Sequence, residues 1–356
     1  MLALILALGI PVAGWSCSVP VFRYALEHWA PDAYEALIFH RGELTGEQQE
    51  LRRRLADGKT GAAPNISVRT IDLDDPAAAE WLPVWETLKG GSLPWLAVRP
   101  AAKTGMRWLL ASEALSRQVV DKLADSPARS EVCRRLAGGQ SAVWVLLGSG
   151  DAEADAAAEK QLTERLAYLR SVLKLPELDE ADIANGLISI GDAELRLEFS
   201  ILKLSRSDPA ERRFVDLLLK TEDDLVELDE PMVFPIFGRG RVLYALVGKG
   251  INNETIDQAA IFLTGRCSCE VKDQNPGVDL LMTADWLSGL RGRTTNAPAP
   301  SAATVQPAEA PVTVTFGAVE SPAPAPKPAS PAPTWRGLLL VLLAAGFVVF
   351  LFTRPW

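Results

Sequence analysis

The same order of secondary-structure signals occurs twice along residues 34–265. Short apolar runs that end at glycine or at turn residues alternate with segments whose apolar residues recur at helical spacing. Each repeat gives the order strand, helix, strand, helix, two paired strands and a last helix; "YEALIFHRG" opens the first and "SAVWVLLGSGD" the second. Parallel strands joined by helices and closed by an antiparallel hairpin form a layered α/β domain. We therefore expect two tandem α/β domains, each with a central mixed sheet flanked by helices.

Chain length and composition agree with two folded domains. The chain has 356 residues, more than a single compact domain usually holds, and 48% of them are hydrophobic. We place the first domain at residues 15–140 and the second at residues 141–290. The formal net charge of -9 argues against a nucleic-acid partner, which needs a basic face. With only two histidines, His28 and His40, we expect neither a metal site nor a cofactor.

Two longer stretches resemble the thioredoxin-like superfamily. "RTIDLDDPAAAEWLPVWETLKGGSLPWLAV" is similar to that family's central strand, following helix and cis-proline loop. "FPIFGRGRVLYALVGKGINNETIDQAAIFL" is similar to its proline, hairpin and last helix. The resemblance covers residues 34–265 and implies two tandem thioredoxin-like domains. It also implies that Pro94 and Pro235 begin strands in the matching cis-proline places. We expect Pro94 alone or both prolines to be cis, since cis peptide bonds are largely confined to X-Pro.

The residues that would make such a domain an oxidoreductase are missing from both repeats. A thioredoxin-type enzyme needs a cysteine pair at the N-terminus of the helix after its first core strand, where the helix dipole lowers the thiol pKa. At that place the first repeat reads "FHRGELTGEQ" and the second "LLGSGDAEAD". His40 lies in the first, but a lone histidine at a strand end is more often solvated or hydrogen-bonded than catalytic. The resemblance thus implies two degenerate domains without catalytic residues.

The four cysteines lie elsewhere, at Cys17, Cys133, Cys267 and Cys269. A disulfide between Cys267 and Cys269 would be strained, because residues two apart in extended chain lie near the upper limit of about 6.8 Å for bridged Cα atoms. Two thiolates without a nearby histidine leave a metal under-coordinated. We therefore expect structural disulfides that fasten this segment to Cys17 or Cys133. An exposed redox pair is the second interpretation and a metal site the third.

The two ends of the chain indicate export and membrane attachment. Residues 1–14, "MLALILALGIPVAG", have the length of a signal peptide but no basic start, so an uncleaved anchor or a misassigned start codon remains open, as does lipidation at Cys17. Residues 291–334 are rich in proline and alanine and predict a disordered, semi-stiff linker. Residues 335–356 are uncharged between Arg336 and Arg354 and predict a transmembrane helix, with a removable sorting signal as the alternative.

These features together predict a single-pass membrane protein whose folded body is extracytoplasmic, as in a bacterial envelope. We expect a non-catalytic binding or assembly module with a protein partner in the envelope. The alternative is a thiol-disulfide or metal-handling protein that uses Cys267 and Cys269. A third interpretation is a peptide-binding domain, since Trp81, Trp85 and Trp95 surround the first proline loop, although such residues more often fill a core.

Overall fold

The computed structural model describes residues 17–58, 62–88, 90–188, 195–267 and 271–286. All of these described residues belong to one compact unit. Within the described ranges, no helix is long and apolar enough to cross a bilayer. The expected signal segment, linker and transmembrane helix lie outside these ranges and stay predictions.

The first sheet has four strands in the order β2-β1-β3-β4. Strands β1 and β2 are parallel, whereas β3 is antiparallel to β1 and β4 is antiparallel to β3. The strands are β1 (Tyr34–His40), β2 (Ile66–Asp72), β3 (Trp95–Arg99) and β4 (Ala111–Ala114). The helices between and after them are α2 (Gly46–Asp57), η1 (Pro76–Trp81), α3 (Leu82–Leu88), η2 (Ala102–Thr104) and α4 (Arg117–Ala124).

The second sheet repeats this arrangement. Its order is β10-β8-β7-β5-β6, with β5 parallel to β6 and antiparallel to β7, while β9 also pairs with β7. The strands are β5 (Ala142–Gly148), β6 (Phe199–Ser205), β7 (Met232–Phe237), β8 (Arg241–Val242), β9 (Leu246–Val247) and β10 (Val278–Asp279). The helices are α5 (Pro127–Ala137), α6 (Ala152–Val172), α7 (Glu180–Ala184), α8 (Arg212–Leu219), η3 (Leu225–Glu227), η4 (Gly248–Gly250), α9 (Asn253–Thr264) and η5 (Lys272–Gln274). The prediction of mixed sheets flanked by helices is confirmed for the described residues.

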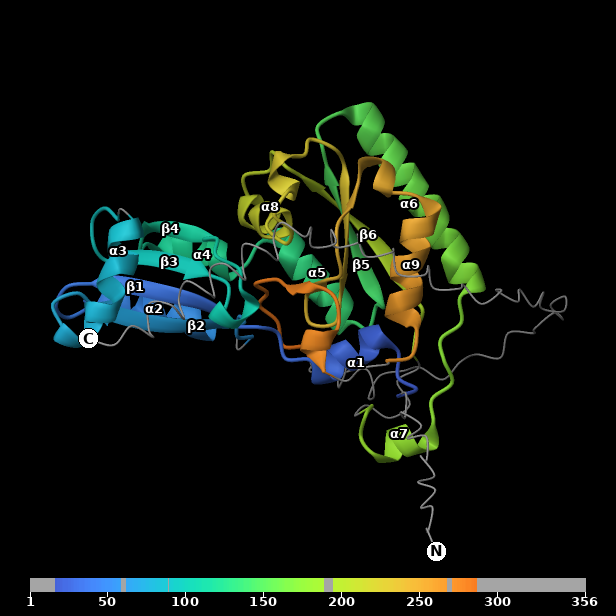
Figure 1. Ribbon diagram of the computed structural model, residues 1–356, viewed down its shortest axis with the longest axis horizontal. Helices are drawn as coiled ribbons and strands as arrows, with labels where there is room; N and C mark the ends of the chain where they lie inside the picture. The colour runs from blue at the N-terminus through green and yellow to red at the C-terminus, as the bar shows by residue number, and fades with distance from the viewer. Residues whose placement is uncertain (1–16, 59–61, 89, 189–194, 268–270, 287–356) are drawn as a thin grey trace, which may run out of the picture. The chain divides into compact units, whose positions relative to one another are not determined.

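Period-2 alternation along the strands separates the apolar core into layers. In the second sheet, Val143 and Val145 face the side that α5 and α8 cover, whereas Trp144 faces α6 and α9. Figure 1 shows α6 and α9 side by side on one face of this sheet, with α5 and α8 on the other. In the first sheet, Ile38 packs toward α2 and α4, and Phe39 belongs to a separate, smaller cluster on the opposite face.

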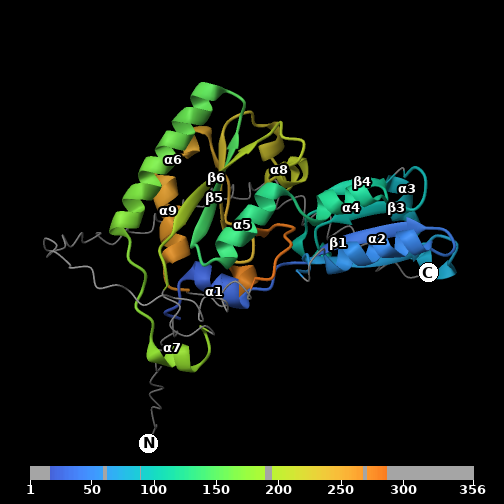
Figure 2. The same cartoon turned by 180° about the vertical axis from the view of Figure 1, so that it is seen from behind.

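Two helices that precede the boundary expected at residue 140 pack against the second sheet. Helix α1 (Val21–His28) precedes the first sheet in sequence, but most of its buried apolar residues, among them Phe22, join the core on the α9 face of the second sheet. The main chain agrees, since the Val21 N–H donates to the Gly265 carbonyl at the end of α9, 3.0 Å away. Figure 2 shows α1 next to the end of α9. Helix α5 likewise packs against β5 and β6. The apolar faces of α1 and α5 therefore pack against the second sheet, although the positions of these helices in the sequence suggest the first domain.

The last described segment, residues 278–286, connects the two sheets. Strand β10 pairs with β8, and the chain then forms an isolated antiparallel bridge between Thr283 and Pro64. The Asn65 side chain donates to the Leu280 carbonyl at 3.0 Å and accepts from the Met282 N–H at 2.7 Å. Its sequence position, within residues 141–290, assigns the segment to the second domain. Its backbone groups instead find partners beside both sheets, as buried polar groups require.

Candidate functional site

The loop after β1 is the first place at which the family resemblance implies an active site. His40 Nδ1 lies 2.8 Å from the Gly42 carbonyl oxygen, and the Gly42 N–H donates to Asp72 Oδ1 at 3.1 Å. Helix α2 then begins with a capping box between Thr45 and Gln48, in which each side chain accepts from the other residue's N–H. The Thr45 and Gln48 N–H groups at the start of α2 therefore already have partners within the chain.

The corresponding loop after β5 is closed by carboxylates. Asp151 Oδ1 accepts from the N–H groups of Glu153 and Ala154 at the start of α6, at 2.9 and 3.1 Å. Asp155 folds back over the loop, and its Oδ1 accepts from the Ser149 N–H at 2.7 Å. A Cβ at Gly148 would lie 2.8 Å from Asp155 Oδ2, so glycine permits this approach. The cavity beside the loop has a volume of about 490 Å³.

The electrostatics of Asp155 fit a capping role. Burial alone would raise its pKa, but hydrogen bonds from Ser149 and Gly150 outweigh burial and hold the pKa below the ordinary value of 3.8. The carboxylate is thus ionised at neutral pH where the helix N-terminus favours negative charge. A thioredoxin-type enzyme would have a thiolate at this helix start, whereas this chain has the carboxylate of Asp155 beside it.

The two proline positions differ from each other. The Leu93–Pro94 peptide bond is cis, and Pro94 directly precedes β3. Pro235 lies inside β7, opposite Trp144 of β5, and is not among the cis peptide bonds of the described residues. The proline that directly precedes β7 is Pro231. Pro94 therefore lies at the start of its strand with a cis bond, whereas Pro235 lies within its strand.

Pro235 has a different structural consequence. Its carbonyl accepts from the Leu243 N–H at 3.0 Å, but proline has no N–H to return to this neighbour. The partner chain accordingly divides into β8, paired with Ile236 and Phe237, and β9, paired with Met232 and Val233. The single hairpin strand expected around "RVLYALVG" is split for this reason.

Cys133 is a free thiol among the described residues and is buried in α5. Burial, followed by the nearby Asp125, raises the pKa of this thiol to about 12. A thiol must be exposed and deprotonated to react, so Cys133 fits neither a redox nor a metal-binding role.

Cys267 lies against the segment that carries Cys17. The Cys267 N–H donates to the Val19 carbonyl at 2.9 Å, and Pro20 and Arg266 form an isolated antiparallel bridge. Both cysteines are buried in the same apolar cluster. Backbone pairing thus joins the segment after α9 to the start of the body, as a staple would. Cys269 lies outside the described residues, and disulfide pairing remains a prediction that mass spectrometry without reduction would test.

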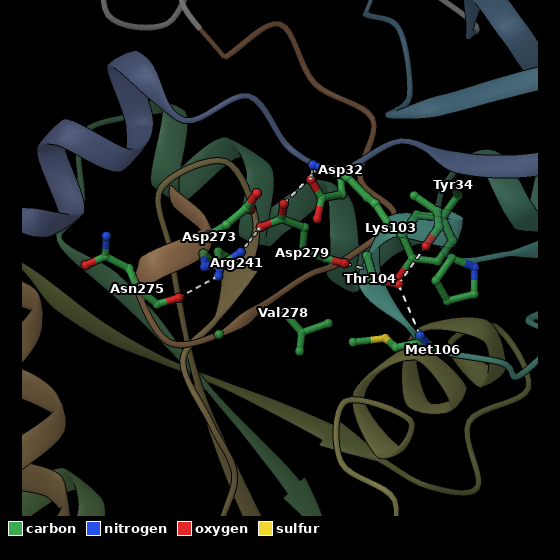
Figure 3. Close-up of a pocket in the computed structure, with 13 residues that line it drawn as sticks. Asp32, Tyr34, Lys103, Thr104, Met106, Arg241, Asp273, Asn275, Val278 and Asp279 are labelled. Atoms are coloured by element: carbon green, nitrogen blue, oxygen red, sulfur yellow. Dashed lines mark hydrogen bonds and ion pairs between the residues drawn. The ribbon is translucent and has the colours of Figure 1, made fainter. Parts of the chain in front are cut away.

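A polar pocket of about 300 Å³ lies where three distant parts of the chain meet (Figure 3). Asp32 lies just before β1 and Tyr34 at its start, and residues 100–106 follow β3. Arg241 comes from β8, and residues 273–279 run from η5 into β10. We call this cavity the polar pocket.

Asp279 lies at the centre of the charges around the polar pocket. It is 7% exposed and directly opposite Arg241 across the β8–β10 pair, with Arg241 Nη1 2.9 Å from Asp279 Oδ1. Asp279 Oδ2 accepts from Lys272 Nζ at 2.7 Å and from the Asp32 N–H at 2.8 Å. Lys272 also forms an ion pair with the Asp32 carboxylate, which Lys103 contacts at 2.7 Å. One network of opposite charges therefore ties the tail to the start of β1.

Each pKa shift described around the polar pocket takes the pKa of the group further from pH 7. Burial would raise the pKa of Asp32, but hydrogen bonds from Lys103 and Lys272 outweigh it and lower the pKa. The hydrogen bond to Asp32 raises the pKa of Lys103. Burial, followed by the charge of Asp279, raises the pKa of Tyr34. A general acid or base needs a pKa near the working pH, so these groups suit ion pairing better than proton transfer.

No cluster of three or more histidine, cysteine or acidic residues that could hold a metal ion occurs in the described ranges. In the polar pocket the ammonium of Lys272 lies between the carboxylates of Asp32 and Asp279. Two side chains remain accessible at the mouth, because Asp273 is exposed and the Lys103 side chain is 58% exposed. The pocket can therefore bind a small polar group without supplying acid–base catalysis.

Sequence reasoning missed every charged residue of the polar pocket. Asp32 and Asp279 are 247 positions apart, and nothing in either local sequence indicates the other. The available signal was the turn cluster "DQNPGVD", which contains Asp273 and Asp279. Of the aromatic residues singled out, Trp81, Trp85 and Trp95 are partly buried against the small cluster of the first sheet.

Comparison of the sequence with protein-family models gives no match, and comparison with curated proteins gives none either.

Proposed function

We propose that this chain is a membrane-anchored, extracytoplasmic binding or assembly module built on two degenerate thioredoxin-like domains. The shared topology supports it: in each sheet the second strand is parallel to the first, the third is antiparallel to the first, and the fourth extends the third. Helices follow the first, second and last core strands of both. A likeness of fold alone carries no activity, so function must be argued from the site.

The observation that carries the non-catalytic part of the proposal is the state of the two helix N-termini. Thr45 and Gln48 cap α2, Asp151 caps α6 and Asp155 binds the loop before α6, so neither helix start carries a thiol. Cys133 and Cys267, by contrast, are buried in apolar clusters. A redox enzyme needs an accessible thiolate at such a helix start.

The membrane part of the proposal rests on sequence. An apolar start, a proline-rich segment and an apolar end flanked by arginines support a body outside the cytoplasm, beside other envelope proteins. Membrane extraction of the full-length chain with alkaline carbonate, followed by protease treatment of intact cells, tests this part. Full-length chain released by carbonate would contradict it.

The decisive experiment compares the full-length chain with a variant that receives the missing cysteines. Wild type should not reduce insulin disulfides in the presence of dithiothreitol. The double variant Thr45→Cys/Gln48→Cys places a Cys-x-x-Cys pair at the cap and third residue of α2, where the dipole should lower the first thiol's pKa below about 8.5. The matched control, Glu50→Cys/Arg53→Cys, places the same spacing on the exposed middle of α2. Measurable turnover by wild type would overturn the proposal, and a variant no more active than its control would argue against the thioredoxin-like fold.

A further inference from the structure

A second cavity, separate from the polar pocket, lies over the first sheet on the face opposite α2 and α4. Its floor is formed by Leu37 of β1 and Ala97 of β3, both buried. One wall is α3, and the other is the loop of residues 102–109. The volume of about 400 Å³ lies within the usual range for binding pockets, about 300–1,000 Å³. We call this cavity the α3 groove.

The α3 groove exists because α3 covers the sheet incompletely. Helix α3 has seven residues, none of them buried, and Leu82 at its start is 40% exposed. The other end of the same face is covered, since Trp85 packs on Phe39 with ring centroids 5.4 Å apart. The floor residues Leu37 and Ala97 are themselves almost fully buried, and the cavity lies above them where α3 leaves this apolar sheet face without a second layer.

The lining of the α3 groove has the composition of a protein interface. Met106, Trp108 and two arginines line it, and these residue types are enriched where proteins bind one another. Large side chains such as tryptophan and arginine supply most of the binding energy at such sites. Met106 also lines the polar pocket, so residues 100–106 separate a polar cavity from an apolar one.

The charge of the α3 groove selects the kind of partner. Arg99 and Arg107 line it, and no acidic side chain does. Glu35 neutralises part of the Arg99 charge at 2.7 Å, whereas Arg107 is exposed and forms no ion pair with a described residue. An apolar floor beside an uncompensated cation fits an apolar side chain next to a carboxylate.

We propose that the α3 groove binds a segment of another protein that carries large apolar side chains flanked by carboxylates. This inference rests on the proposed function and names its partner chemistry. The apolar side chains occupy the floor over Leu37 and Ala97. The flanking carboxylates pair with Arg107 and Arg99 at the rim. A second copy of this chain is the competing occupant, and the experiment separates the two.

The experiment measures fluorescence anisotropy of a labelled peptide of about ten residues, in which leucine pairs alternate with glutamate pairs, against the full-length chain in detergent. Two control peptides replace either the glutamates by lysine or the leucines by serine. Arg107→Glu reverses the free cation, with Arg53→Glu on exposed α2 as its control. Thr87→Trp fills the groove from an exposed position on α3, with the neighbouring Glu86→Trp as its control.

We expect saturable binding of the glutamate-leucine peptide and little binding of either control peptide. Arg107→Glu should weaken binding by about tenfold or more, and added salt should narrow the difference. Thr87→Trp should abolish binding, whereas both control variants should bind like wild type. Unchanged melting temperatures would show that all variants fold.

Three results would overturn the inference. They are equal binding of the lysine peptide, absence of saturable binding, and binding unaffected by Thr87→Trp. A concentration-dependent dimer that Thr87→Trp dissociates would assign the α3 groove to a second copy and also overturn it. Insulin reduction by wild type would contradict the proposed function alone, so the two failures are distinguishable.

Discussion

The two sheets of this chain share one order of strands but differ in how completely their faces are covered. Six of the seven residues of β5 are buried, and the second sheet has long or strongly apolar helices on both faces. The first sheet has α2 and α4 on one face but only η1 and α3 on the other, and edge strand β2 has a single buried residue. The second sheet is thus filled by its own chain, and the first retains a face on which a partner can pack.

Proline in the covering segment explains part of this difference. The segment between β2 and β3 has Pro76 at the start of η1 and Pro83 within the first turn of α3. Proline is tolerated at the start of a helix but breaks its interior, so this segment forms two short pieces. The matching segment of the second sheet has Pro209 before α8, and its eight helical residues run uninterrupted. Leu217 and Leu218 of α8 are fully buried as a result.

The largest expected effect concerns the side chain that links the two sheets. Arg129 of α5 is 1% exposed and donates to the carbonyls of Lys122, Leu123 and Leu281, at 2.8, 3.0 and 3.3 Å. Arg129→Ala should lower the free energy of unfolding by about 3–5 kcal/mol, because it removes packing and leaves buried carbonyls without donors. Urea unfolding followed by tryptophan fluorescence measures the change.

The control for this prediction is on the same helix. Arg134→Ala removes a side chain that is 70% exposed and should cost less than about 1 kcal/mol, although it pairs with Glu131. Equal losses in the two variants would show that Arg129 does not hold the end of α4 to the tail.

Features that depend on neighbouring residues in the sequence could be predicted, whereas features that depend on contacts between distant residues could not. Hydrophobic period and local caps are short-range, so strands such as β1 and β5 and the Thr45 cap of α2 are predictable from a few neighbouring residues. Asp32, Arg241 and Asp279 meet only through tertiary structure. Helix α1 packs on the second sheet with its apolar face, and its local sequence does not indicate which of the two sheets that face contacts. The incomplete cover by α3 depends on neighbouring side chains and was also not predictable.

The next largest effect concerns the polar pocket, where the tail pairs with the start of β1. Asp279→Asn keeps the size of the side chain but removes the charge that Lys272 and Arg241 share. The free energy of unfolding should fall by about 2 kcal/mol, less than for deletion of a buried partner, because the amide still accepts hydrogen bonds. Chemical denaturation measures it.

Asp273→Asn is the matched control for Asp279→Asn, since Asp273 lines the same pocket but is exposed. Its effect should stay within about 0.5 kcal/mol. If both variants behave alike, the pocket charges do not fasten the tail, and the two sheets are joined by apolar contacts alone.

A smaller effect, visible only at high pH, comes from Cys133 in the core cluster that both sheets contribute to. Its pKa is about 12 in the folded protein against an ordinary value of 9.0, so the unfolded chain loses this proton first. Stability from the neutral thiol is complete below pH 9 and is lost as pH rises from 9 toward 12. At pH 10 the loss should be roughly 1 kcal/mol.

The measurement is the difference in unfolding free energy between wild type and Cys133→Ala at pH 8 and pH 10. Native Cys133 should also resist iodoacetamide at pH 8 and react after denaturation. Rapid alkylation of the native thiol would show that this core is open and would remove the contrast between a filled second sheet and an accessible first one.

The smallest effect belongs to Asp32 at the mouth of the polar pocket. Its folded pKa is lowered, because hydrogen bonds from Lys103 and Lys272 outweigh burial, so its stabilising contribution is present above the ordinary pKa of 3.8 and lost as pH falls below it. Since Lys103 is largely exposed, Asp32→Asn should cost less than about 1 kcal/mol at pH 7. The difference from wild type should shrink further between pH 4 and pH 2. Lys103→Met should reproduce only part of the loss at pH 7, because Lys272 still pairs with Asp32. A difference that grew on acidification would mean that the Asp32 pKa is raised, and that this pocket holds a protonated carboxyl rather than an ion pair joining the two sheets.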